Sequence, residues 1–87
     1  MIEIRTDATI YYIDDNGKEA MQSYMAVNKS NVLELAEEMA KSRKVTKVRF
    51  ETNSKRITPE ITLPVGQSIE WYDVKDGKIK PRSASWG

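Results

Sequence analysis

Apolar and polar residues alternate at the beginning of the chain. Over residues 2–13 the apolar side chains recur at every second position, in the set Ile2, Ile4, Ala8, Ile10 and Tyr12. A period of two in β-branched and aromatic residues predicts a strand with one buried face. Asn16 and Gly17 follow, and this dipeptide between two alternating runs is a strong signal for a tight hairpin. We therefore expect a second strand over residues 18–28.

The hairpin predicts a register that the apolar pattern can test. With a two-residue turn at the Asn-Gly pair, Tyr12 lies opposite Met21. This pairing gathers the apolar residues of both strands on one face, as a correct register must. The opposite face then carries Tyr11 and Tyr24 nearly side by side.

A helix is predicted next, over residues 32–41. Asn31 fits the N-cap and Glu34, three residues later, fits a capping box. The basic residues of 41–44 suit the negative end of the helix dipole, so we expect the helix to end there. The apolar spacing predicts that it packs on the sheet through Val32, Leu35 and Met39.

The alternation returns over residues 45–52, which predicts a third strand ending in a turn at residues 53–54. The following segment, residues 56–65, contains Pro59 and Pro64. Prolines this close together confine a segment to a sheet edge or an extended loop.

The last part of the chain predicts a turn at residues 66–67, a strand over 68–75, and a second hairpin at Asp76 and Gly77 into residues 78–80. The element order is β-β-α-β-β-β. It predicts an α+β fold, a mostly antiparallel sheet of four to five strands with one helix packed on one face. A crossover through the helix should set the third strand beside the first. Residues 1–87 form one domain, with a loose tail over 82–87.

The composition excludes several classes of chemistry. The 87 residues include no cysteine and no histidine, which removes disulfides, thiol nucleophiles and histidine-based triads. No phosphate-binding glycine motif and no calcium-binding loop is present. We therefore expect no catalytic residues, no metal site and no cofactor. The sequence shows no secretory signal and no membrane-spanning stretch, so we expect a cytoplasmic protein without a membrane partner.

The charge is unevenly distributed. Residues 1–40 carry three bases and eight acids, whereas residues 41–87 carry eleven bases and five acids, for a total of +1. A basic segment can contact phosphates, although lysine and arginine also serve routinely on the outer faces of strands. Nucleic-acid binding is therefore an alternative function, and its candidate residues are Lys44, Lys47, Arg49, Lys55 and Arg56.

Aromatic residues mark a second candidate surface. Tyr11, Tyr24 and one of Trp71 and Tyr72 are expected on the sheet face that the helix leaves open. Such a face can stack bases, and tyrosine and tryptophan are also favoured anchors of protein interfaces. We expect a protein contact in preference to base stacking, with a host protein or a second copy of the chain.

The layout of residues 2–52, with its hairpin, helix and third strand, is similar to small phage-encoded host-takeover proteins, anti-CRISPR proteins among them. The resemblance rests on layout and size and carries no residue role. It implies an inhibitor that blocks a host protein complex by surface contact. The expected function is therefore that of a non-enzymatic binding protein, with Tyr11, Tyr24, Trp71 and Tyr72 as contact residues.

Overall fold

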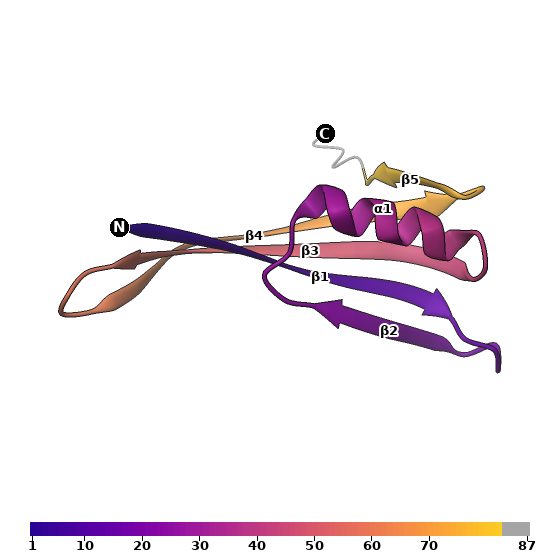
Figure 1. Cartoon of the computed structure of the whole chain (residues 1–87), viewed down its shortest axis with the longest axis horizontal. Helices are drawn as coiled ribbons and strands as arrows, with labels where there is room; N and C mark the ends of the chain where they lie inside the picture. Colours follow the sequence, from indigo (N-terminus) through magenta and orange to yellow (C-terminus); the bar gives the residue numbers. More distant parts are fainter. Residues whose placement is uncertain (83–87) are drawn as a thin grey trace, which may run out of the picture.

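The computed structural model describes residues 1–82 as one antiparallel five-stranded sheet and one helix (Figure 1). The elements are β1 (Ile2–Ile13), β2 (Glu19–Tyr24), α1 (Lys29–Ala40), β3 (Lys44–Ile57), β4 (Thr62–Lys75) and β5 (Lys78–Pro81). The strand order is β2-β1-β3-β4-β5. The predicted α+β class, the element order and the position of the third strand beside the first are confirmed. Most of the expected tail, residues 83–87, lies outside the described residues.

The core lies between α1 and the middle of the sheet. The helix contacts β1, β3 and β5. Val32 is buried as expected and Met39 is half-buried, but Leu35 is 39% exposed and Ala36 takes the central place. A small side chain at that position lets the helix backbone approach the strands closely. The buried cluster consists of Ala8, Ile10, Val32, Ala36, Val45, Val48 and Phe50.

The predicted start of the helix was wrong. The N-cap is Asn28, whose side-chain oxygen accepts a hydrogen bond of 2.9 Å from the backbone N–H of Ser30. Asn31, the expected cap, lies inside the first turn. Both asparagines carry a suitable side chain, but only Asn28 has the extended backbone of an N-cap, with φ −90° and ψ 127°.

The predicted register of the first hairpin was also wrong, by one residue. Tyr11 lies opposite Met21, and Tyr12 lies opposite Ala20. The loop has three residues between Asp14 and Lys18, because the Asp14 carboxylate accepts hydrogen bonds of 2.9 Å from the backbone N–H groups of Asn16 and Lys18. The third loop residue, a glycine, has a φ of 78°. This three-residue loop closes with a left-handed glycine where we expected a two-residue turn.

The single added loop residue moves every side chain of β2 to the other face of the sheet. Tyr24 therefore packs against the buried cluster on the helix side. Met21 points away from that side and is exposed. The two predicted partners, Tyr11 and Tyr24, lie on opposite faces of the sheet.

The β3–β4 hairpin is longer than predicted. Each strand has 14 residues, and neither residues 53–54 nor residues 66–67 form a turn. The chain reverses at residues 58–61, where the Thr58 hydroxyl donates to the Ile61 carbonyl at 2.9 Å. Gly66 lies opposite Ser54, next to a register shift between Ser54 and Lys55. Lys55 pairs with Pro64, so Val65 is the extra residue of a bulge inside a continuous strand.

One end of the sheet extends beyond the helix. We call it the three-stranded extension; it comprises residues 2–5, 53–57 and 62–67 (Figure 1). β2 pairs only with residues 8–13 of β1, and β5 only with residues 72–75 of β4, so neither reaches the extension. The Cα radius of gyration is 15.4 Å, compared with about 12 Å for a compact chain of this length. The exposed side chains of the three-stranded extension include Ile4, which is 67% exposed.

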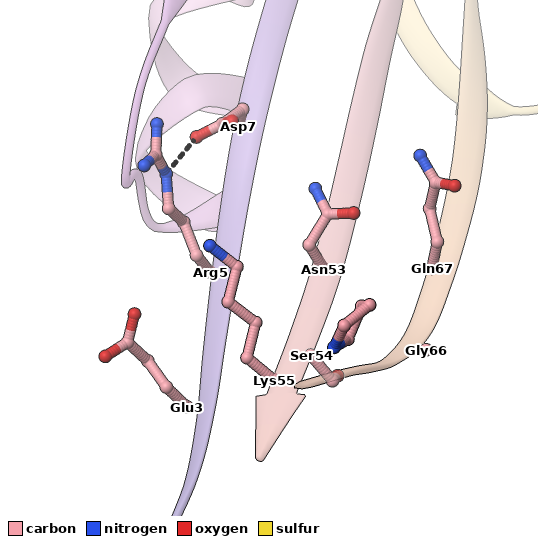
Figure 2. Close-up of a pocket in the computed structure, with 9 residues that line it drawn as sticks. Glu3, Arg5, Asp7, Asn53, Ser54, Lys55, Gly66 and Gln67 are labelled. Atoms are coloured by element: carbon pink, nitrogen blue, oxygen red, sulfur yellow. Dashed lines mark hydrogen bonds and ion pairs between the residues drawn. The ribbon is translucent and has the colours of Figure 1, made fainter. Parts of the chain in front are cut away.

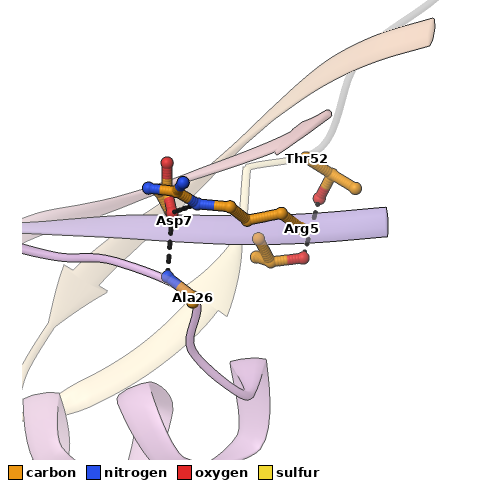
Figure 3. A network of polar contacts seen from close by, with 5 residues as sticks. Arg5, Asp7, Ala26 and Thr52 are labelled. Carbon is orange, nitrogen blue, oxygen red and sulfur yellow. Dashed lines mark hydrogen bonds and ion pairs between the residues drawn. The ribbon is translucent and has the colours of Figure 1, made fainter. Parts of the chain in front are cut away.

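A carboxylate holds the connection between β2 and α1. One oxygen of Asp7 accepts hydrogen bonds of 2.9 Å from the backbone N–H of Ala26 and from the Arg5 guanidinium (Figure 3). Ala26 has a φ of 53°, a left-handed conformation that costs an L-residue about 1–2 kcal/mol. The two donors hold the pKa of Asp7 below its usual value, with the Ala26 N–H making the larger contribution.

We predict that Phe50→Ala lowers the free energy of unfolding by about 3–5 kcal/mol, because Phe50 lies at the centre of the buried cluster. Leu35→Ala removes a side chain that is 39% exposed and should cost less than about 1.5 kcal/mol. Urea unfolding of the two variants measures the difference. An equal loss for both would show that the helix packs through Leu35 after all.

We predict that the carboxylate of Asp7 stabilises the fold at neutral pH and that acid removes this effect. Because its pKa is lowered in the folded state, the stabilisation is present above the unfolded-state pKa and is lost as the pH falls through the folded-state pKa. Asp7→Asn should therefore be less stable than the wild type at about pH 7 and equal to it below the folded-state pKa. Urea unfolding across this range tests the prediction, with Asp15→Asn in the exposed hairpin loop as the control at neutral pH.

Candidate functional site

The four aromatic residues predicted as contact residues divide between the two faces of the sheet. Tyr11 and Trp71 lie on the face opposite the helix, which we call the open face. Tyr24 and Tyr72 lie on the helix side, packed against the buried cluster. Tyr72 contacts Phe50 there in an edge-to-face arrangement with ring centroids 5.4 Å apart. The expectation that Tyr24 lies on the open face was therefore wrong, and of Trp71 and Tyr72 it is Trp71 that lies there.

The Tyr72 ring lies beside an ion pair that links the start of the helix to β4. Lys29, the first residue of α1, pairs with the Glu70 carboxylate and lies 5.2 Å from the Tyr72 ring centroid. The hydrogen bond between Lys29 and Glu70 raises the pKa of Lys29 and lowers the pKa of Glu70. Tyr72 thus has a structural role beside the helix.

The open face brings Tyr11 and Trp71 together with basic side chains. Their ring centroids are 5.9 Å apart, although the two residues are 60 positions apart in the chain. The Lys47 ammonium lies 4.8 Å from the Tyr11 centroid and 5.5 Å from the Trp71 centroid. The Arg49 guanidinium lies 5.9 Å from Trp71 and 3.6 Å from the Glu51 carboxylate. We call Tyr11, Lys47, Arg49 and Trp71 the aromatic platform.

Arg82 borders the platform. Its backbone N–H donates to the Trp71 carbonyl at 2.9 Å, and its guanidinium lies 5.4 Å from the Trp71 centroid. The same guanidinium donates two hydrogen bonds to the Asp73 carboxylate, at 2.6 and 3.0 Å. These bonds lower the pKa of Asp73 and keep it ionised. Arg82, the first residue of the expected tail, is therefore held against the sheet.

The structure divides the predicted basic segment as well. Lys47, Arg49 and Lys55 share the open face, because they alternate along β3. Arg56 is on the opposite face, and Lys44 is the exposed first residue of the strand. Two of the five predicted residues thus belong to the aromatic platform.

The β4–β5 hairpin supplies basic residues that we did not predict as site residues. The second hairpin has the predicted two-residue turn, with φ values of 52° for Asp76 and 74° for Gly77. Because side chains alternate between the faces of a strand, every second residue outward from this turn shares one face, and this rule would have predicted which side chains of the hairpin share the open face with Trp71. Those side chains are Asp73, Lys75, Lys78, Lys80 and Arg82.

Another hollow lies on the open face of the three-stranded extension. It measures about 520 Å³, and Figure 2 shows its polar lining. Glu3 lies opposite Lys55 across the strands, and Arg5 lies opposite Asn53. No aromatic side chain lines it, and its charges are mixed. It is therefore a less specific surface than the aromatic platform.

Comparisons with known proteins give no match: no family model, no curated protein and no solved structure matches the chain. Within residues 1–82 no helix is long and apolar enough to cross a membrane. No group of three or more acidic, histidine or cysteine residues in that part of the chain could hold a metal ion. The site must therefore be judged from its own chemistry.

We predict that Tyr24→Ala destabilises the protein by about 1–3 kcal/mol, because Tyr24 packs partly buried against the core. Tyr11→Ala removes a ring from the open face and should cost less than about 1 kcal/mol. Thermal unfolding of the two variants is the measurement. A larger loss of stability for Tyr11→Ala than for Tyr24→Ala would contradict the assignment of Tyr24 to the helix side and of Tyr11 to the open face.

Proposed function

We propose that the protein is a non-enzymatic binding module whose open sheet face binds single-stranded nucleic acid. The observation that carries this proposal is the aromatic platform, in which Tyr11 and Trp71 lie together with Lys47 and Arg49 around them. Single-strand binders combine aromatic rings that stack on bases with cations that follow the phosphates.

The energetics of such binding suit the platform. Stacking of one base on an aromatic side chain contributes about 1–3 kcal/mol and tolerates any base. Lys47 and Arg49 reach the rings through long, flexible side chains. A base can replace them on the Trp71 ring while their charges turn to the flanking phosphates.

The distribution of charge supports the same proposal. The whole chain has a net charge of only +1, but its cations are unevenly placed. Six of them share the open face of β3, β4 and β5: Lys47, Arg49, Lys75, Lys78, Lys80 and Arg82. Glu34, Glu37 and Glu38 are exposed on α1, away from the open face. Beside the platform the open face holds cations in excess of Asp73 and Glu51. A local positive field attracts a polyanion even when the net charge is small.

A protein partner is the second candidate function, and the three-stranded extension is the observation that favours it. Ile2, Ile4, Leu63 and Val65 are exposed there. Contiguous apolar surface is typical of protein contacts. A host protein complex, which the similarity to phage inhibitors implies, or a second copy of the chain would suit this surface better than a nucleic acid.

The test is fluorescence anisotropy with labelled oligo-dT and oligo-U at about 50 and 200 mM salt. We expect binding that weakens steeply with salt, by a log–log slope of about −0.7 for each phosphate contacted. Trp71→Ala should weaken binding at least fivefold, because it removes a stacking surface worth at least about 1 kcal/mol.

The matched controls separate charge from position. Arg49→Gln removes a cation from the platform and should reduce the salt slope, whereas Lys41→Gln removes one from the helix side and should not. Absence of binding at the lower salt, or unchanged binding by Trp71→Ala, would refute the proposal. If Ile4→Glu abolished a host-protein or self-association contact instead, the second candidate would replace it.

A further inference from the structure

Two lysines face each other across the β4–β5 hairpin. Lys75 lies directly opposite Lys78, and the next open-face pair is Asp73 and Lys80. Like charges directly opposite on paired strands destabilise a sheet. The tight turn at residues 76–77 fixes this register, so the two ammonium groups cannot separate by a slip of the strands.

These lysines line a pocket of about 220 Å³. Its lining residues are Asp73, Lys75, Lys78, Lys80, Pro81 and Arg82. The carboxylate of Asp73 is occupied by the Arg82 guanidinium through two hydrogen bonds. Within residues 1–82 none of the three lysines takes part in an ion pair. The pocket therefore holds three ammonium groups whose charge its own acid does not neutralise.

The other acid nearby does not serve this pocket. Asp76 belongs to the turn and lines a separate hollow with Arg43 and Lys44, beside the end of the helix. Lys47, in contrast, lies directly opposite Asp73 on the neighbouring strand β3, so it adds positive charge at the pocket's border with the platform. The pocket is thus cationic on the side that meets the platform.

The pocket and the aromatic platform are continuous. Arg82 lines the pocket and lies 5.4 Å from the Trp71 ring centroid. Trp71 and Asp73 share the open face of β4, two residues apart. A group bound in the pocket is therefore next to anything stacked on Trp71.

We propose that this pocket is an anion site for phosphate groups, and that it receives the phosphates that flank a base on Trp71. The second half of this statement rests on the proposed function. A phosphate between Lys75 and Lys78 offsets their mutual repulsion, so its binding restores stability that the hairpin lacks without it. Lysines bind phosphate as point charges with little geometric demand, which suits a backbone contact without sequence preference.

The test compares two double variants of equal charge change. Lys75→Gln/Lys78→Gln alters the pocket, and Lys18→Gln/Lys41→Gln alters exposed lysines outside it. Sodium tripolyphosphate serves as the isolated anion. We expect it to raise the melting temperature of the wild type and of the control variant but not of the pocket variant. Without anion, the pocket variant should melt at or above the wild-type temperature, because the opposed charges are gone.

Oligo-dT and oligo-U then test the link to the platform. The pocket variant should reduce the magnitude of the salt slope by about 0.7 for each phosphate that the two lysines neutralise in the wild type, while Trp71→Ala lowers affinity through stacking. Equal stabilisation of the pocket variant and the wild type by tripolyphosphate would overturn the anion site.

The two proposals fail in distinguishable ways. If the oligonucleotides bind through Trp71 and the salt slope of the pocket variant equals that of the wild type, the pocket does not receive the flanking phosphates and the proposed function stands. If tripolyphosphate stabilises the protein through the two lysines and neither oligonucleotide binds, the anion site stands. Its link to nucleic acid is then wrong.

Discussion

The alternation of side chains along β3 determines what each face of this protein can do. β3 is the central strand, paired with β1 on one side and with β4 on the other. Its buried residues Val48 and Phe50 hold the helix, and the residues between them and before them, Lys47 and Arg49, must therefore point the other way. A single helix covers one face only. The core thus forces these cations onto an uncovered surface, where Tyr11 and the tryptophan of β4 meet them.

The sequence predicted the order of the helix and strands correctly but the register of the β1–β2 hairpin wrongly. The hairpin and the crossover through the helix predicted the order of the first three strands, but the alternating pattern fits two registers of β2 because Met21 and Ala20 are both apolar. The side chain of Asp14 decides between them by capping a three-residue loop. At Asp76, where no such competing acceptor acts, the predicted two-residue turn was confirmed.

The candidate site could be predicted only in part for the same reason. Tyr11 depends on β1 alone, so its face followed from the apolar pattern. Tyr24 depends on the hairpin register, and its face changed with it. For Trp71 and Tyr72 the sequence left the choice open, because both neighbours are aromatic and either could lie over Phe50. In the structure Tyr72 is the one on the helix side, where Lys29 pairs with Glu70 and lies over the Tyr72 ring.

The sheet also explains how a nearly neutral chain can carry a cationic surface. The acids of the helix and most bases of the strands belong to different halves of the sequence. Their charges nearly cancel in the net charge of the whole chain, which is +1. The crossover through α1 places the helix glutamates on one side of the sheet and leaves most bases of β3, β4 and β5 on the other. At physiological ionic strength charges are screened over about 8 Å. A ligand on the open face therefore responds to the nearby cations far more than to glutamates across the sheet.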